Sequence, residues 1–261
     1  MNRKKSALPL WGRNALVLLF WLGAWQLAAM AVGQKILFVT PLETLGCLSS
    51  LLPKAEFWAR IALSSARILG GFLLGGGCAL LLAPLARRWA WFGALLRLPM
   101  RLVKATPVAS FIILALLWVS SRWLSLLISF LMVLPVLYGA VETGLESADR
   151  QLLEMAQVFR LGLGARFRAI WLPALLPAFR QGCSVALGIC WKSGIAAEVI
   201  GLPNGSIGDA LYRAKITLAT GEVFAWTAVI ILLSALFEKA FLWGLQKAER
   251  KLLGGEVCAW R

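Results

Sequence analysis

Two ionisable side chains, Lys192 and Glu198, lie within one long apolar run of the sequence. A charge inside a membrane-spanning segment is costly, so such residues often line the route of an ion or a solute. Lys192 lies near one end of the run, however, and a long lysine side chain can extend to the membrane surface instead. The two residues are six apart, a spacing that does not favour an ion pair on one helix. A pathway role and a surface-seeking lysine both stay open at this point.

The residues that most enzymes use are missing or scattered. The sequence contains no histidine, which removes the commonest general base and metal ligand. It contains neither a G-x-x-x-x-G-K-[ST] phosphate-binding loop nor a G-x-S-x-G nucleophile elbow. The acids near the apolar runs are dispersed along the chain: Glu142, Glu146, Glu198, Glu222 and Glu238. We therefore expect no catalytic site, no metal and no cofactor in this chain.

The five cysteines do not change this expectation. None of them forms a C-x-x-C pair, and Cys183 and Cys190 would be about 10 Å apart along a helix, too far for a disulfide. We interpret them as small residues packed inside the protein.

The composition is that of a polytopic membrane protein. Hydrophobic residues make up 60% of the 261 positions, and the mean hydropathy is +0.79. Soluble domains are only about 45–50% apolar. We expect an all-α protein with about six membrane spans: 15–33, 63–85, 107–120, 123–141, 173–199 and 223–245.

The formal net charge of +15 is explained by topology and does not indicate nucleic acid. With the N-terminus inside, nineteen Lys and Arg residues fall on inner segments and six on outer segments. We therefore expect both termini to be cytoplasmic.

Two patterns predict how individual segments pack. Gly71 and Gly75 form a G-x-x-x-G pair that permits close contact between helices. Residues 89–104 place Arg97, Arg101 and Lys104 on one face, opposite Trp91, Leu95, Leu98 and Leu102, which predicts an amphipathic helix near the inner surface.

The longest polar, basic segment between two apolar runs is Glu154–Pro173. We expect a helix over 148–161, capped by Ser147 with Asp149 in its first turn. Gly162 and Gly164 should then break the helix before the next apolar run begins at Pro173. A helix, a glycine turn and a second helix outside the membrane would make a docking element.

This segment resembles the cytoplasmic "EAA" loop of ATP-binding-cassette (ABC) importer permeases. Glu154, Ala156, Ile170, Leu172 and Pro173 are in register with that motif. Met155 replaces the first Ala, and Arg160 stands where the family usually has Gly, with Gly162 two residues later. We expect the turn to be displaced accordingly.

Two further stretches are similar to permeases of the nitrate/sulfonate/taurine type. They are 104–118, and 191–201 together with Ile207-Gly208 and 220–226. This resemblance, which covers roughly residues 60–245, implies a type I ABC importer (MetI-like) permease fold. It divides the chain into 1–62, with a cytoplasmic tail, the first span and an external amphipathic segment, a permease core at 63–245 with its coupling loop at 142–172, and a basic cytoplasmic tail at 246–261.

The resemblance also implies partners and roles. It implies two ABC ATPase subunits, a second permease copy in a homodimer, an external periplasmic substrate-binding protein and a bacterial inner membrane around the chain. Lys192 and Glu198 become pathway candidates. The residues that would couple to the ATPase are Glu154, Met155, Ala156, Gln157, Phe159, Arg160, Gly162, Gly164, Leu172 and Pro173.

Two other functions stay open: a membrane scaffold or assembly protein that does not transport, and an ion-driven secondary carrier. A carrier should show acids in the middle of its spans, whereas most acids here lie near span ends. The sequence does not identify the solute among nitrate, sulfonates, taurine, pyrimidines and thiamine precursors.

Overall fold

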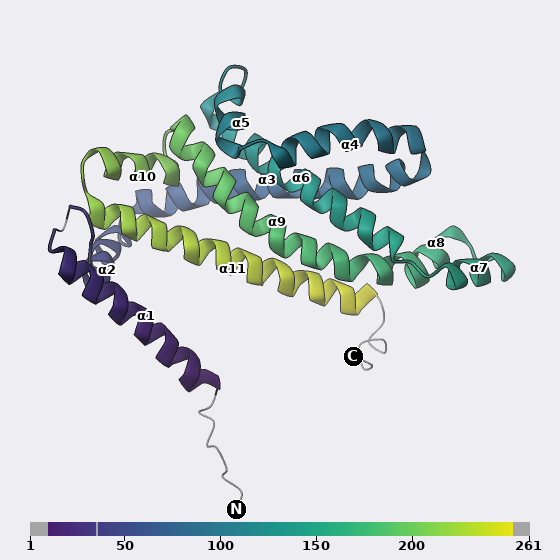
Figure 1. Cartoon of the computed structure of the whole chain (residues 1–261), viewed down its shortest axis with the longest axis horizontal. Helices are drawn as coiled ribbons and strands as arrows, with labels where there is room; N and C mark the ends of the chain where they lie inside the picture. Colours follow the sequence, from purple (N-terminus) through teal and green to yellow (C-terminus); the bar gives the residue numbers. More distant parts are fainter. Residues whose placement is uncertain (1–9, 35, 253–261) are drawn as a thin grey trace, which may run out of the picture. The chain divides into compact units, whose positions relative to one another are not determined.

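A computed structural model describes residues 10–34 and 36–252, and every regular element in that part of the chain is helical. The helices are α1 (Leu10–Val32), α2 (Pro41–Leu51), α3 (Ala55–Arg88), α4 (Ala90–Ala105), α5 (Val108–Ala115), α6 (Ser121–Glu146), α7 (Arg150–Val158), α8 (Leu163–Arg166), a π-helical segment (Phe167–Trp171), α9 (Leu172–Gly201), α10 (Ile207–Ile216) and α11 (Thr220–Leu252) (Figure 1). The outer parts of the two predicted tails, including Cys258, lie outside the described residues.

Four helical stretches are each long and apolar enough to cross a membrane: 55–88, 121–146, 163–201 and 220–251. A fifth crossing is available if α4 and α5 act as one broken span, and the apolar part of α1, Leu16–Val32, has seventeen residues, the lower limit for a span. These segments account for the expected all-α, multi-span architecture.

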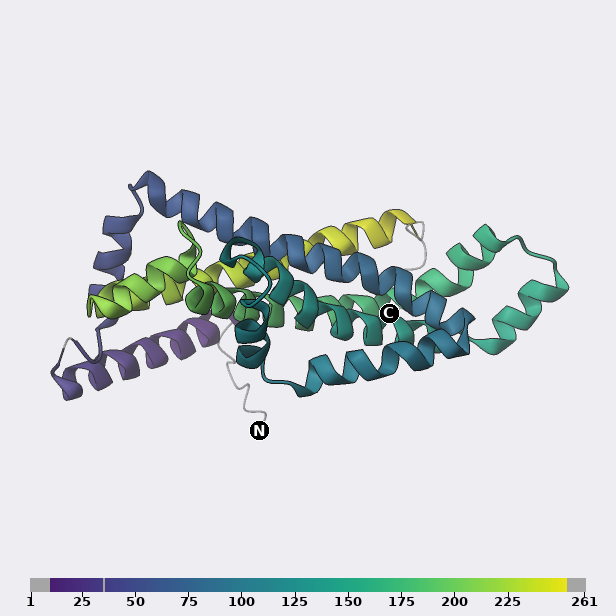
Figure 2. The same ribbon diagram turned by 90° about the horizontal axis from the view of Figure 1, so that it is seen from above.

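The predicted third span at 107–120 is wrong as a single helix. Its helical part, α5, has only eight residues, which extend about 12 Å. It follows α4 after a bend of 105°, because Pro107 cannot continue the hydrogen-bonded ladder. Figure 2 shows α4 turning back from the end of α3 toward α5, and α4 packs on α6. The helix predicted over 89–104 is confirmed as α4, and α4 and α5 together are apolar enough for a broken span or a re-entrant loop.

The described chain divides into two compact units, formed by 10–58 with 210–229 and by 59–209 with 230–252. The first unit is held by aromatic contacts and turns. The Trp25 indole N–H donates to the carbonyl of Val39 at 3.0 Å, and the Phe224 ring lies 5.8 Å from that of Trp25 and 5.6 Å from that of Phe38. A capping box of Thr40 and Glu43 begins α2.

In the second unit, α6 and α9 form the most extensive helix pair, and the predicted glycine contact joins α3 to α6. A Cβ on Gly71 would lie 2.5 Å from the carbonyl oxygen of Leu126, and one on Gly75 would lie 3.0 Å from the Val133 side chain. The close approach predicted from the G-x-x-x-G pair is thus confirmed.

Candidate functional site

The α7–α8 segment projects beyond the ends of α6 and α9 (Figure 1). Helix α7 begins two residues later than predicted, at Arg150, because Asp149 is its N-cap: the Asp149 carboxylate accepts a hydrogen bond from the Gln151 N–H at 2.8 Å. The predicted cap, Ser147, instead ends α6, where its hydroxyl donates to the carbonyl of Gly144. The helix also ends earlier than predicted, at Val158.

The turn after α7 lies at Arg160 and is not displaced to the glycines. Arg160 has a φ of +50°, the left-handed conformation that favours glycine. Its N–H bonds to the carbonyl of Gln157, and the N–H of Leu161 bonds to that of Ala156, which together make a complete Schellman motif. Gly162 has an ordinary φ of −62° and precedes α8. The position where the EAA motif usually has glycine is therefore the left-handed position, occupied here by arginine.

The loop is stabilised internally while its apolar residues face outward. The Arg166 guanidinium donates to the carbonyl of Ala156 at 3.3 Å, and the Ala156 side chain is fully buried. Met155, Val158 and Phe159 are 48%, 79% and 70% exposed. A groove of about 540 Å³ is lined by Leu153, Gln157, Leu163, Arg166, Phe167 and Trp171. An exposed apolar stripe beside a groove is typical of a surface that another protein covers.

The second arm of the loop continues into a membrane span without a break. Residues 163–201 form one helical rod of 39 residues, about 58 Å long. Its π-helical part, Phe167–Trp171, precedes Pro173, which has no N–H to donate. The Arg87 guanidinium lies 5.1 Å above the Trp171 ring and links the end of α3 to this part of the rod. Leu172 and Pro173 are half-buried where the rod enters the helical bundle.

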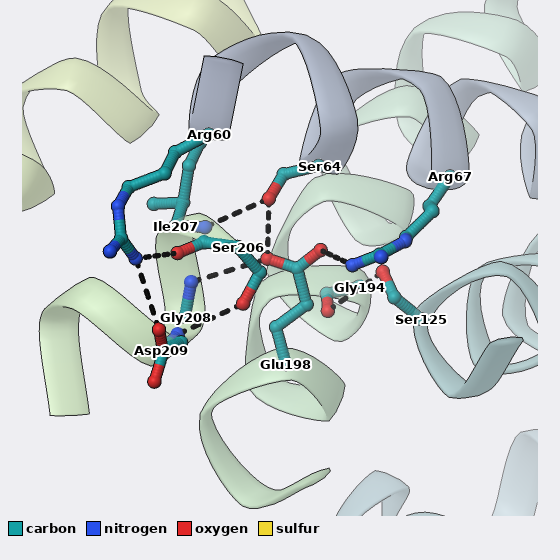
Figure 3. Close-up of polar contacts among 10 residues, drawn as sticks. All are labelled: Arg60, Ser64, Arg67, Ser125, Gly194, Glu198, Ser206, Ile207, Gly208 and Asp209. Carbon is teal, nitrogen blue, oxygen red and sulfur yellow. Dashed lines mark hydrogen bonds and ion pairs between the residues drawn. The ribbon is translucent and has the colours of Figure 1, made fainter. Parts of the chain in front are cut away.

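The far end of the same rod carries Glu198, whose side chain is fully buried (Figure 3). One carboxylate oxygen accepts hydrogen bonds from the Ser64 hydroxyl at 2.7 Å and from the Gly208 N–H at 3.2 Å. The other oxygen forms an ion pair with the Arg67 guanidinium at 3.9 Å. A buried carboxylate needs such partners, and the first turn of α10 adds the favourable end of a helix dipole.

A second ion pair extends this network, which we call the Glu198 cluster (Arg60, Ser64, Arg67, Glu198 and 206–209). The Arg60 guanidinium contacts the Asp209 carboxylate at 3.0 Å and the carbonyl of Ser206 at 3.2 Å. The Ser64 hydroxyl accepts a bond from the N–H of Ile207 at 2.9 Å. The cluster therefore ties one face of α3 to the end of α9 and the start of α10.

The family model for the binding-protein-dependent transport system inner membrane component matches residues 71–251. That match covers well over half of the 261 residues.

The chain belongs to this family of transport permeases.

Two similar proteins are permeases named for sulfonates. The putative aliphatic sulfonates transport permease protein SsuC of Escherichia coli (strain K12) is 30% identical over 219 residues, covering 82% of this chain and 81% of the relative. The SsuC protein of Bacillus subtilis (strain 168) is 26% identical over 246 residues, covering 93% and 87%. The taurine transport system permease protein TauC of E. coli is 28% identical over 258 residues, covering 92% and 87%.

The structure separates the two pathway candidates of this permease. Lys192 lies on an exposed face of α9, whereas Glu198 is enclosed by the cluster. Sequence reasoning missed the partners of Glu198 on α3. The spacing of Arg60, Ser64 and Arg67, which places all three on one helical face, was the available signal.

Proposed function

We propose that this permease forms half of the translocation pathway of an ATP-driven importer and that its α7–α8 loop receives the motion of a cytosolic ATPase subunit. The observation that carries the proposal is the exposed apolar stripe of α7 on a loop that continues directly into α9. An isolated stripe of this kind needs a partner groove to cover it. Two permease copies, two ATPase subunits and an external binding protein complete the assembly.

The loop residues divide into two groups by their surroundings. Met155, Gln157 and Phe159 are exposed and contact the ATPase subunit, and the exposed Glu154 contacts polar groups in its cleft. Buried Ala156 and the turn at Arg160 set the angle between the two arms. Gly162 and Gly164 leave space around the start of α8, since no other atom lies within 4 Å of a Cβ at either position.

Motion reaches the membrane through the rod. When ATP binding closes the ATPase subunits, the loop moves with them, and a continuous helix transmits that displacement along its axis. Leu172 and Pro173 lie where the rod enters the bundle, and Glu198 lies near its far end. Because the Glu198 cluster connects that end to α3 and α10, the displacement changes the packing of three helices at once.

The charge distribution supports cytoplasmic termini and a cytoplasmic α7–α8 loop. A C-terminal reporter that is active only in the periplasm should therefore stay silent. Strong periplasmic activity of that reporter would contradict this orientation.

The relatives named for aliphatic sulfonates and taurine favour a small sulfonate as the solute. The decisive experiment is uptake of radiolabelled taurine and ethanesulfonate by proteoliposomes that contain the permease with its cognate ATPase and binding protein. Uptake should require ATP inside, the ATPase subunit and the binding protein.

Uptake that follows an ion gradient without ATP would identify a carrier. An ATPase subunit that co-purifies with the permease, without uptake of any solute that the binding protein accepts, would favour a scaffold. Both outcomes would overturn the proposal.

A further inference from the structure

Helix α4 carries a row of three cations that the coupling mechanism does not use. Arg97, Arg101 and Lys104 follow one another at four and three residues, so they lie on one face, and all three are exposed. Trp91, Leu95 and Leu98 on the opposite face are 67%, 62% and 65% exposed, as expected of a surface that meets lipid. We call the three cations the α4 ladder.

The ladder faces protein and not the lipid side of α4. Arg97 lines a cavity of about 230 Å³ together with Glu142 and Glu146 of α6. The Lys104 ammonium lies 3.7 Å from the position that a Cβ on Gly139 of α6 would occupy. Arg101 lies between Arg97 and Lys104 on the same face of the helix, so the ladder follows the side of α4 that is next to α6.

The outer end of the ladder lies at the break in the span. Helix α4 ends at Ala105, and after Thr106 and Pro107 the chain bends by 105° into α5. Within a membrane, interrupted backbone is tolerated only where it is buried in protein or lines a water-filled cavity. Charged side chains are subject to the same restriction. The break and the ladder are independent observations, and both place this part of the chain against protein or water and away from lipid.

The compensation of charge differs along the ladder. At the inner cavity, Arg87 and Arg97 are balanced by Glu142 and Glu146. Within the described residues, neither Arg101 nor Lys104 forms an ion pair with a carboxylate. An anion would therefore be held beside Arg101 and Lys104 and held less strongly at the inner cavity, which favours its release there.

We propose that the α4 ladder binds the anionic group of the solute during passage through the inner half of the permease. The proposal rests on the proposed function and specifies the group that is recognised: a sulfonate or a group of similar charge. A lipid phosphate has the same chemistry, and the experiment separates the two sources.

The test uses a cysteine at Gly139, where an added Cβ meets only Lys104 and at an ordinary contact distance. In the full chain, with the native cysteines replaced, Gly139→Cys is exposed to two water-soluble methanethiosulfonates in inside-out vesicles. One reagent carries an ethylsulfonate and the other an ethyltrimethylammonium group. No ATPase or binding protein is needed, so the result is independent of whether the assembly transports.

The ethylsulfonate reagent should react faster than the cationic reagent, and replacing Lys104 and Arg101 by Gln should lower the ratio of the two rates by about tenfold or more. Excess ethanesulfonate should slow the anionic reagent. An unchanged ratio in the double variant, or no reaction with either reagent, would overturn the proposal.

The lipid source is tested by the vesicle composition. With phosphatidylcholine alone and with one-fifth phosphatidylglycerol, the ratio of rates should be the same at high ionic strength. If adding one-fifth phosphatidylglycerol is enough to abolish the preference for the anionic reagent, the ladder holds lipid headgroups and the proposal is wrong.

Discussion

The two ends of the 163–201 rod are built in opposite ways. At the α7–α8 end, the hydrogen bonds of the Asp149 and Arg166 side chains join residues two and ten positions apart, and the apolar side chains face outward. At the Glu198 end, the Ser64–Glu198 bond joins residues 134 positions apart, and the charges face inward. One end is a separate, locally folded surface suited to a partner, and the other is part of the core. Substitutions at the two ends should therefore fail differently.

The largest effect on stability is expected at the buried end. Glu198→Ala removes the partner of Arg67 and the acceptor for Ser64 and Gly208, which should destabilise the permease by about 3 kcal/mol or more. Thermal unfolding of the purified protein in detergent measures this loss. Glu198→Gln keeps an acceptor oxygen and should therefore lose less stability than Glu198→Ala. An unchanged unfolding temperature in Glu198→Ala would show that the cluster does not stabilise the fold.

Ala156→Asp should damage the loop while leaving the rest of the protein folded. The Ala156 side chain is fully buried, so the larger, charged Asp side chain must lose its water or displace its neighbours, which should disfavour the folded loop by about 2–4 kcal/mol. Membrane insertion should be normal, whereas co-purification of the ATPase subunit and uptake should be lost.

Gln151→Asp is the matched control, because Gln151 is exposed in the first turn of α7 and is not among the residues proposed to contact the ATPase subunit. It should insert equally and bind the ATPase subunit more strongly than Ala156→Asp does. Equal loss of ATPase binding in both variants would contradict the distinction between buried and exposed loop positions.

A substitution at the turn after α7 should stabilise the loop. Arg160 adopts a left-handed conformation that costs a non-glycine residue about 1 kcal/mol or more, so Arg160→Gly should stabilise the loop by roughly that amount. Gly162→Ala should have little effect, since its φ is ordinary and the space around it is open. Protection of the 150–166 amides against hydrogen exchange distinguishes the two variants. Marked destabilisation by Gly162→Ala, with no gain from Arg160→Gly, would instead place the turn at the glycines.

Lys192→Met should have the smallest effect on stability, because Lys192 is exposed and outside the Glu198 cluster. If Lys192 lines the pathway, taurine uptake should fall while assembly and basal ATP hydrolysis stay intact. Unchanged uptake kinetics would show that the Lys192 side chain only extends to the membrane surface and has no role in transport.

The comparison also explains what the sequence could predict. The α7 helix, its Asp149 start region and the apolar stripe depend on neighbours within a few residues, so local patterns indicated them. The cap at Asp149 was misassigned because serine and aspartate are about equally good N-caps, and the turn at Arg160 because glycine is the usual residue in the left-handed position. The inward position of Ala156 depends on the fold of the loop, which its size alone does not reveal.

The Glu198 cluster could not be predicted from local sequence patterns. Glu198 was recognised as an unusual charge, but its partners on α3 and α10 are set by how three helices pack. The break at Pro107 was missed for a related reason: residues 107–120 are apolar enough for a membrane, and only the fold shows that α5 is short and follows α4 after a bend of 105°.

The most direct test of the account is a disulfide crosslink between Gln157→Cys and a cysteine in the cleft of the ATPase subunit. Gln157 lines the groove on the exposed loop, so the crosslink should form in a complex that transports. Crosslinking should then stop uptake, and reduction should restore it. A control cysteine at Arg122, in the predicted external turn, should form no crosslink. If no position from 152 to 160 forms a crosslink in an actively transporting complex, the loop does not dock on the ATPase and the proposed coupling is wrong.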